Sequence, residues 1–267
     1  MMTYLSKRRA RRLSSRAARK AAAARFERME RRLVLAADVG WNPNNGFLNV
    51  YDASGGTQGI YVKIYASNGW TKVADLNGVF WDGSQHNCPA IDVTSIEVDG
   101  SISVQNGDYI DLNGVDAVDF PNIGRGSVVV YGKNGNDTID LGWAGESAYG
   151  GFGNDSLVGG SGPDTIYGGN GGNGTEGGYD YINGMGGNDD LVAESTAGAQ
   201  LYDGNGDPIP LSEVYGGSGN DYITDADAMD YLSGDGGNDM IVAGGGPNRF
   251  RDFRFFSKKV LAAGRAA

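Results

Sequence analysis

Apolar residues recur at a fixed interval of nine in the second half of the chain. In nine-residue units counted from Ile123, the eighth position is apolar and the first six are mostly glycine or polar. This pattern predicts a six-residue turn followed by a three-residue strand whose apolar side chain faces inward. Two units make one coil, so equal faces recur every 18 residues. The apolar eighth positions are Val130, Ile139, Ala148, Leu157, Ile166, Ile182, Leu191, Val214, Ile223, Leu232 and Ile241.

Upstream of these units, the hydrophobic pattern predicts ordinary strands. Residues 60–65 alternate between apolar and polar positions, and residues 91–98 and 127–130 are further strand candidates. We expect the parallel coils to begin near Ile91 and to occupy residues 91–129. Residues 38–90 would then form a small β region or cap. Its Trp and Phe side chains are interpreted as core, with a sugar-binding platform as the alternative.

Acidic residues recur at the sixth position of the same units. Glycines earlier in each unit permit positive φ angles and a close approach of the backbone, so that peptide carbonyls can point at one centre. A carboxylate at position six adds a hard anionic oxygen, and Ca²⁺ prefers six to eight oxygen ligands. The alternative for any one of these residues is that its side chain only stabilises a local Asx turn and binds no metal. The acids are Asp137, Glu146, Asp155, Asp164, Asp180, Asp189, Asp221, Asp230 and Asp239.

The best units, which begin at Gly150, Gly159 and Gly216, read Gly-Gly-x-Gly-x-Asp-x-apolar-x and resemble the RTX, or hemolysin-type, calcium-binding repeat. The resemblance implies an all-β parallel β-roll, or solenoid, with several Ca²⁺ ions between adjacent turns. It implies Asp155, Asp164, Asp221 and Asp239 as the strongest ligands, followed by Asp137, Asp180 and Asp189. Its turn glycines correspond to Gly150, Gly153, Gly159, Gly162, Gly168, Gly216, Gly219 and Gly234. Glu146 and Asp230 are doubtful, because their turns lack the glycine pair.

Composition and charge agree with a turn-rich, cation-binding chain. Glycine supplies 46 of the 267 residues. Residues 36–247 hold 30 Asp or Glu and 4 Lys or Arg, a net charge of −26 that bound cations would relieve. A single cysteine, Cys88, excludes an intramolecular disulfide, and a single histidine excludes a His-rich zinc site. The chain has no stretch of 18 apolar residues, so the sequence predicts no membrane span.

The repeats divide into segments. Residues 130–192 form a first repeat block, and residues 212–246 form a second. Residues 193–211 interrupt the pattern, and we expect this interruption to divide the roll. A Gly- and Asn-rich insertion around 170–177 enlarges one turn of the first block. Residues 247–267 are a basic, aromatic tail that could cap the coils or act as a signal.

The N-terminal residues 1–37 form a basic segment. Residues 1–35 carry a net charge of +10, and no Gly or Pro occurs from Arg16 to Leu35, which favours a helix. Residues 25–36 resemble the LEPR-XLL segment of exported planctomycete-type proteins. That resemblance implies an export or sorting tag. A transit peptide, a solvated helix and a nucleic-acid arm are the alternatives.

The function expected from the sequence is a non-enzymatic, exported calcium-binding protein whose repeats fold when Ca²⁺ binds. We expect it outside a bacterial cell or on its surface, with calcium and surface or matrix polymers as partners, and with no nucleic acid. One alternative is the calcium-binding, secretion-assisting part of an exported hydrolase. Another is a calcium-independent adhesion solenoid. No metalloprotease motif and no Gly-x-Ser-x-Gly motif occurs in the chain.

Overall fold

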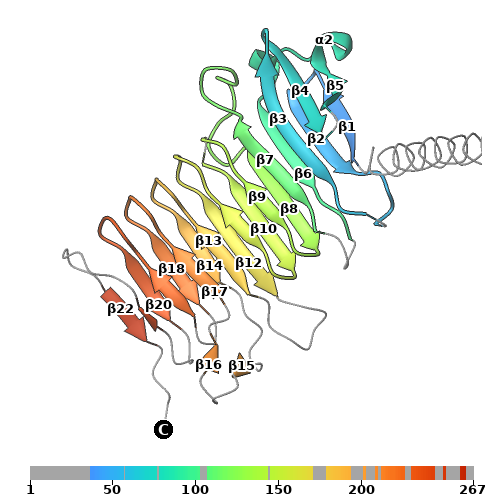
Figure 1. Cartoon of the computed structure of the whole chain (residues 1–267). Coiled ribbons are helices and arrows are strands. Elements are labelled where there is room, and N and C mark those ends of the chain that lie inside the picture. Colours follow the sequence, from blue (N-terminus) through green and yellow to red (C-terminus); the bar gives the residue numbers. More distant parts are fainter. Residues whose placement is uncertain are drawn as a thin grey trace, which may run out of the picture. The chain divides into compact units, whose positions relative to one another are not determined.

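Two ten-stranded sheets that face one another make up the fold (Figure 1). The computed structural model describes residues 37–262 apart from 57, 77, 103–106, 144, 171–178, 194–200, 203–207, 210–211, 226–229, 244–248 and 251–258. The predicted all-β roll is confirmed. The basic segment, apart from residue 37, lies outside the described residues, so the helix and the export tag expected there stay predictions.

The strands follow one another across each sheet in a regular order. The first sheet runs β1 (Ala37–Asn42), β2 (Phe47–Asp52), β6 (Ser95–Asp99), β8 (Val128–Asn134), β10 (Ser147–Phe152), β12 (Thr165–Asn170), β14 (Asp190–Ala193), β18 (Tyr222–Asp225), β20 (Met240–Ala243) and β22 (Lys259–Ala262). The second runs β5 (Gly78–Asp82), β4 (Trp70–Asp75), β3 (Tyr61–Ser67), β7 (Tyr109–Gly114), β9 (Thr138–Asp140), β11 (Ser156–Val158), β13 (Asp180–Asn183), β17 (Ser212–Tyr215), β19 (Tyr231–Ser233) and β21 (Arg249–Phe250).

The chain passes from one sheet to the other in every nine-residue unit. Adjacent coils then pair in parallel with the register that the sequence predicts. Ser147 lies beside Thr165 in the first sheet, and Thr138 lies beside Ser156 in the second. Both pairs are 18 residues apart, which is one full coil.

A stack of single apolar side chains fills the space between the sheets in the repeat coils. Each of these side chains comes from the eighth position of a unit, and none is more than 4% exposed. They stack because side chains at equivalent strand positions lie directly above one another in a parallel, in-register ladder. The buried members after residue 134 are Ile139, Ala148, Leu157, Ile166, Ile182, Leu191, Val214, Ile223, Leu232 and Ile241.

The parallel coils begin before residue 91. Strand β2 already pairs in parallel with β6, and β3 pairs in parallel with β7. The predicted start near Ile91 is therefore wrong. The sequence shows no 18-residue repeat there, because equivalent residues of the first two coils, such as Val62 and Ile110, are 48 positions apart. Helix α2 (Gly83–His86) and a 3₁₀ turn at Ala90–Asp92 lie within the 48-residue coil.

Antiparallel strands close the N-terminal end of the roll. Strand β1 pairs antiparallel with β2, while β4 and β5 extend the second sheet in the same antiparallel manner. Trp81 is buried there, and Trp41 and Phe80 pack against the core, as the core interpretation of these aromatics requires. The cap is thus built on the same sheets as the coils.

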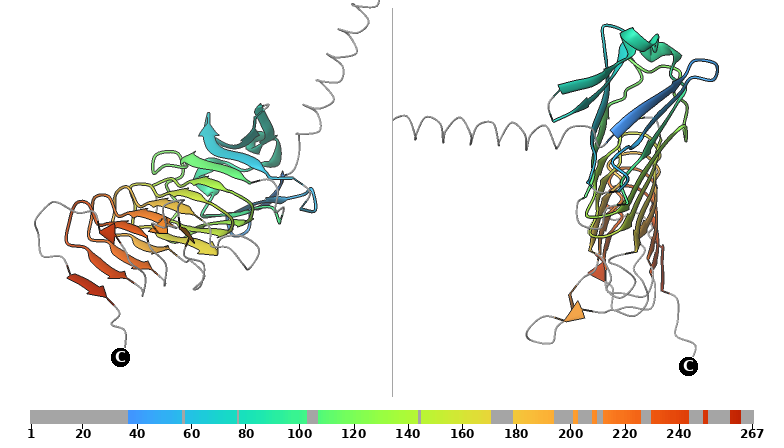
Figure 2. Two further views of the ribbon diagram at one scale, coloured as in Figure 1. Left: turned by 60° about the horizontal axis from the view of Figure 1, so that its bottom comes forward. Right: turned by 90° about the vertical axis from the view of Figure 1, so that its right-hand side faces the viewer.

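The interruption at 193–211 does not divide the roll. Strand β13 pairs directly with β17, and β14 pairs directly with β18, so both sheets continue across it. The interrupting residues include a two-stranded hairpin, β15 (Leu201–Tyr202) with β16 (Pro208–Ile209), which stands off the sheets (Figure 2). Sheet pairing requires only that the strands stay in register, and lengthening a connecting loop costs little free energy.

The C-terminal tail contributes the last strand of each sheet. The backbone of Arg249–Phe250 pairs with β19, and that of Lys259–Ala262 pairs with β20. Backbone pairing of this kind covers two sheet edges that the repeats would otherwise leave open.

Candidate calcium sites

The sixth-position acids come together in two rows, one along each side of the roll. The first turn row consists of the turns that lead from the first sheet into the second, and the second turn row consists of those that lead back. Register in the sheets aligns the turns of each row. The first row ends its turns at Asp108, Asp137, Asp155, Asp180, Ser212 and Asp230, and the second at Glu146, Asp164, Asp189, Asp221 and Asp239.

One carboxylate oxygen of most of these acids accepts a backbone hydrogen bond from the preceding turn of its row. The N–H of Asp137 donates to Oδ1 of Asp155 at 2.8 Å, and the N–H of Asp155 donates to Oδ1 of Asp180 at 2.9 Å. In the second row, Asp164 donates to Asp189 at 2.8 Å and Asp189 donates to Asp221 at 2.9 Å. These bonds hold the carboxylates at fixed positions between adjacent turns.

The second oxygen of several acids is buried without a hydrogen-bond donor. This holds for Oδ2 of Asp137, Asp155, Asp180 and Asp189, whose side chains are at most 3% exposed. A buried charged oxygen without a partner costs several kcal/mol, so each of these atoms needs a bound cation or a proton. A hard cation fits them, because carboxylate oxygens are preferred ligands of Ca²⁺.

The first glycine of each turn brings a carbonyl oxygen close to the same carboxylate. A Cβ atom placed on Gly150 would lie 2.4 Å from Oδ2 of Asp155 and 2.4 Å from the carbonyl oxygen of Gly168 in the next turn. The same test on Gly216 gives 2.4 Å to Asp221 and 2.9 Å to the carbonyl of Gly234. Only glycine leaves these oxygens accessible. Gly159, Gly168 and Gly234 likewise lie against the Oδ2 atoms of Asp164, Asp180 and Asp239.

The fourth residue of most turns is glycine for a different reason. Gly153 and Gly219 have φ angles of +136° and +153°, and added Cβ atoms would lie 1.8 and 1.4 Å from carbonyl oxygens of the neighbouring turns. No side chain fits at such distances. The carbonyl of Gly162 likewise lies 2.2 Å from the position of an added Cβ on Gly187. These glycines let adjacent turns stack closely enough to share a ligand.

Asparagines at position five form a second ladder that the sequence interpretation overlooked. Asn136 Oδ1 accepts the N–H of Asn154 at 3.0 Å, and Asn188 and Asn220 accept from the next Asn of their row at 2.8 Å. The signal was present, because Asn recurs immediately before Asp in five units. These bonds fix the backbone beside each acid.

Burial perturbs the carboxylates in the absence of a cation. Desolvation raises the pKa of Asp137 to about 8. The hydrogen bond from the Asp108 N–H opposes this rise, and the nearby carboxylates of Asp108 and Asp155 add to it. Burial also raises the pKa of Asp155, Asp180 and Asp189 to about 7. Proton uptake near neutral pH is the alternative to cation binding for these groups.

The repeats contain no basic side chain that could neutralise these acids. Residues 134–248 hold 19 Asp or Glu and no Lys, Arg or His. Nowhere in the described part of the chain do three or more acidic, His or Cys side chains converge on one point. Each ion would therefore combine a few carboxylate oxygens with backbone carbonyls, which is the arrangement the turns provide.

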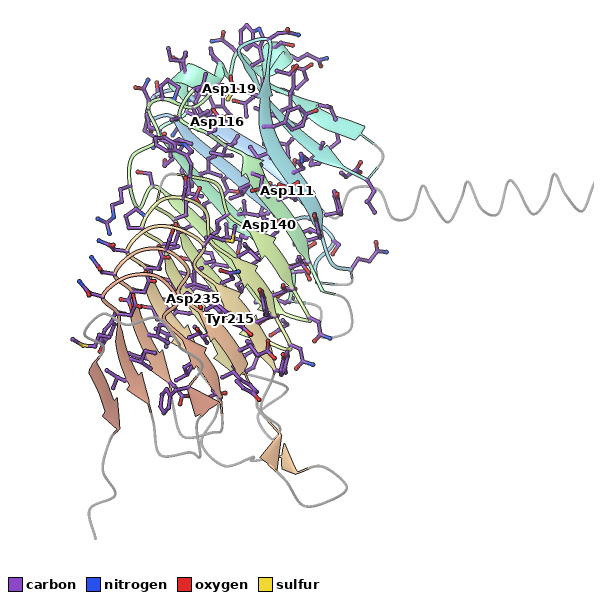
Figure 3. All side chains as sticks on the ribbon, turned by 60° about the vertical axis from the view of Figure 1, so that its left-hand side comes forward. Asp111, Asp116, Asp119, Asp140, Tyr215 and Asp235 are labelled. Carbon is purple, nitrogen blue, oxygen red and sulfur yellow. The ribbon has the colours of Figure 1, made fainter. Side chains whose placement is uncertain are left out.

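Two acids on the outer face of the second sheet have protein partners, unlike the acids of the turn rows. Asp111 on β7 and Asp140 on β9 are neighbours in register (Figure 3). Nζ of Lys63 lies 2.6 Å from Oδ2 of Asp111, and the side chain of Asn113 hydrogen-bonds Asp140. Protein groups thus satisfy these carboxylates, and they belong to neither turn row.

The doubtful acids take up positions in the rows despite their unusual turns. Glu146 is 1% exposed and donates its N–H to Oδ1 of Asp164 at 2.8 Å. Asp230 is fully buried, and burial raises its pKa while the neighbouring Asp225 side chain lowers it. Ser212 stands where the first row would carry an acid. Strand register therefore places both acids correctly, while Ser212 and Asp225 distinguish the end of the first row from the rest.

A family model matches the same turns. The RTX calcium-binding nonapeptide repeat matches in four copies, at residues 124–144, 149–173, 175–195 and 214–250. These units are RTX repeats. The resemblance drawn from the sequence is confirmed, and the chain carries RTX calcium-binding repeats between residues 124 and 250. No curated protein and no solved structure matches the chain.

Proposed function

We propose that the protein is a non-enzymatic, exported calcium-binding module whose RTX repeats fold when Ca²⁺ binds. The observation that carries the proposal is the ladder of buried carboxylates that keep one oxygen unpartnered, as at Asp155 and Asp189. Without a cation these groups oppose folding, through desolvation and mutual repulsion. With Ca²⁺ they become ligands, and the free energy of binding contributes to folding.

In this proposal the two turn rows provide the ligands. Carboxylate oxygens of Asp137, Asp155 and Asp180 serve the first row, and those of Asp164, Asp189, Asp221 and Asp239 serve the second. The carbonyls of the first glycines complete the sites. Bound Ca²⁺ supplies the positive charge that the repeat sequence lacks.

Export is proposed on physical grounds. Extracellular fluid is rich in calcium and the cytosol is poor in it, so a calcium-dependent roll would stay loose before export and fold after it. The chain cannot form an internal disulfide, which leaves metal as the available cross-link. None of the helices in the portion described by the structure is long and apolar enough to cross a membrane. Bacterial surface or matrix polymers are the proposed partners.

An equilibrium Ca²⁺ titration with stoichiometry, followed in parallel by far-ultraviolet circular dichroism, tests the proposal. We expect several ions per chain and a gain of β-structure as they bind. Saturable binding with an unchanged spectrum would contradict coupled folding, and no binding would favour the calcium-independent solenoid. A screen of the calcium-loaded protein on esters, peptides and polysaccharides tests the non-enzymatic assignment, which turnover of any of them would overturn.

A further inference from the structure

Three tyrosines form a stacked ladder on the outer face of the first sheet. Tyr131, Tyr149 and Tyr167 each follow the buried apolar residue of their unit, and they pair in register across β8, β10 and β12. The ring centroids of Tyr131 and Tyr149 are 5.2 Å apart, and those of Tyr149 and Tyr167 are 5.0 Å apart. The ring planes differ by only 15° and 3°. Because these side chains point away from the turns, the ladder is separate from the candidate calcium sites.

Stacking leaves the edges and hydroxyl tips of these rings in contact with solvent. Tyr149 has a neighbouring ring on each of its faces and is still 36% exposed, while Tyr131 is 37% exposed. A partner on this surface therefore meets ring edges and phenol groups. The edge of an aromatic ring carries partial positive charge, which attracts oxygen atoms, and a phenol O–H both donates and accepts hydrogen bonds. The ladder thus suits a partner rich in hydroxyl and ether oxygens.

The ladder lies in an uncharged area of a strongly acidic chain. The members of this tyrosine patch are Val129, Tyr131, Ser147, Tyr149, Thr165 and Tyr167, which occupy two adjacent rows in register. Acids border the patch, because Glu97 pairs with Val129 and Asp190 pairs with Thr165. Residues 36–247 carry a net charge of −26, so a polyanion such as nucleic acid, or the acidic body of a second copy, would be repelled. The charges favour a neutral partner.

The spacing of the ladder restricts the partner further. A partner that contacts every coil in the same way must itself repeat at the 5.0 to 5.2 Å that separate the rings. An extended peptide presents side chains to one side about every 6.6 Å, so it falls out of step with the coils. A pyranose sugar linked through equatorial bonds at opposite ends of its ring spans a distance close to the ring spacing. Each sugar of such a polymer can therefore face one tyrosine.

We propose that the tyrosine patch binds a neutral, extended polysaccharide that lies along the roll with one sugar on each coil. The phenol groups hydrogen-bond sugar hydroxyls, and Ser147 and Thr165 add two further hydroxyls beside them. Stacking already holds the rings in place, so binding them costs little conformational entropy. The inference rests on the proposed function, because it assigns a surface and a chemistry to the polymer partner proposed there.

Affinity electrophoresis of the calcium-loaded full chain in native gels tests the proposal. Hydroxyethylcellulose is the probe, since it is neutral and extended. Dextran is neutral but flexible, and carboxymethylcellulose has the backbone of the probe with negative charges added. We expect hydroxyethylcellulose to retard the protein and the other two polymers to have little effect. No retardation by hydroxyethylcellulose, or equal retardation by either of the others, would overturn the proposal. Failure of the same sample to bind Ca²⁺ would instead overturn the proposed function.

Tyr149→Thr removes the central ring of the ladder, with Tyr181→Thr as the matched control. Tyr181 lies on β13 in the opposite sheet, where its ring is tilted by 43° against that of Tyr215. Tyr149→Thr should raise the dissociation constant for hydroxyethylcellulose about tenfold, and Tyr181→Thr should leave it unchanged. Tyr149→Phe keeps the stack and removes one hydroxyl, so it should weaken binding roughly fivefold even if Tyr149→Thr fails to fold. Unchanged affinity in a folded Tyr149 variant would overturn the proposal.

Analytical ultracentrifugation tests a second copy of the chain as the occupant of the patch. We expect the wild-type protein and Tyr149→Thr, both loaded with Ca²⁺, to sediment alike. A dimer of the wild-type chain that Tyr149→Thr dissociates would overturn the polysaccharide proposal, because the patch would then be covered by the partner copy.

Discussion

The N-terminal coils, residues 37–133, and the repeat coils, residues 134–243, share one pair of sheets but are stabilised differently. Most N-terminal strands bury two apolar side chains, such as Leu48 and Val50 on β2. Most repeat strands bury one, such as Leu157 on β11. Since each buried aliphatic side chain contributes about 1.5–3 kcal/mol, the repeat coils receive much less stabilisation from burial.

The two regions also neutralise their acids differently. All three ion pairs in the described residues lie in the N-terminal coils or at their boundary, and they join Lys63 to Asp111, Lys72 to Asp82 and Lys133 to Asp99. The repeat coils place their acids in two buried rows with no basic residue nearby in sequence. The same topology can therefore rest on apolar burial and ion pairs in one region and on a bound cation in the other.

The largest effect that separates the regions should be the pH dependence of the calcium-free fold. Burial raises the pKa of Asp137 to about 8 and those of Asp155 and Asp180 to about 7, above the unfolded value near 3.9. The folded state therefore binds more protons, and the stability contributed by these groups is present below about pH 4 and lost as the pH rises through 7 to 8. Between about pH 4 and pH 7 to 8, each such carboxylate lowers the free energy of unfolding by about 1.4 kcal/mol per pH unit.

In chelator, acidification from pH 8 to about pH 4.5 should restore repeat structure. The N-terminal coils should share this behaviour less, because burial raises the pKa of Asp108 only to about 6, while hydrogen bonds from Lys72 and Ser84 lower the pKa of Asp82 to about 2. Circular dichroism in chelator across this range measures the effect. A calcium-free protein with less β-structure at pH 4.5 than at pH 8 would contradict it.

A single glycine in the repeats should matter almost as much. Gly219→Ala places a Cβ 1.4 Å from the Gly187 carbonyl at a φ of +153°, so adjacent turns must separate. We expect a loss of about 3 kcal/mol or more in the stability of the calcium-loaded repeats. The matched control is Gly40→Ala in β1, where the nearest atom to an added Cβ is 4.0 Å away. Chemical denaturation of both variants makes the comparison, and equal losses would refute it.

Strand register explains which parts of the fold and the sites could be predicted from the sequence. Asp155 and Leu157 occur at fixed positions in a nine-residue unit, so that the fold and most site residues could be inferred. Residues 106–110 resemble an imperfect copy of the repeat, but Asp108 was not among the predicted ligands, because three extra residues in its turn break the nine-residue register. The continuity of the roll past residues 193–211 was missed because an inserted loop interrupts the nine-residue period of the sequence. The strands on either side of the loop still pair with each other.

Removing one carboxylate should have a smaller, local effect. Asp155→Ala deletes a ligand whose Oδ2 is buried and unpartnered, so we expect affinity for Ca²⁺ to fall on the order of tenfold or more. Asp230→Ala should lower it less, because the preceding coil of its row carries Ser212 in place of an acid. Calorimetric Ca²⁺ titration of both variants provides the ranking, which equal losses of affinity would disprove.

The smallest effect is expected from an ion pair of the N-terminal coils. Lys63→Met removes the partner of Asp111 from a site where the lysine side chain is 42% exposed. The lysine end of the pair is solvated while the Asp111 side chain is 11% exposed, so we expect a loss of about 1 kcal/mol in stability and no change in Ca²⁺ affinity. Thermal melting and Ca²⁺ titration of this variant measure the two quantities. A marked fall in affinity would show that the two regions are not stabilised independently.

Hydrogen exchange resolved by peptide, with Ca²⁺ and with chelator, tests the difference between the regions most directly. Exchange of backbone amides reports local opening, and it can be followed separately in each region of the native chain. We predict that chelation removes protection from peptides within residues 134–243 and leaves peptides within residues 37–133 largely protected. Equal protection of the repeats with and without Ca²⁺, or equal loss in both regions, would contradict the account.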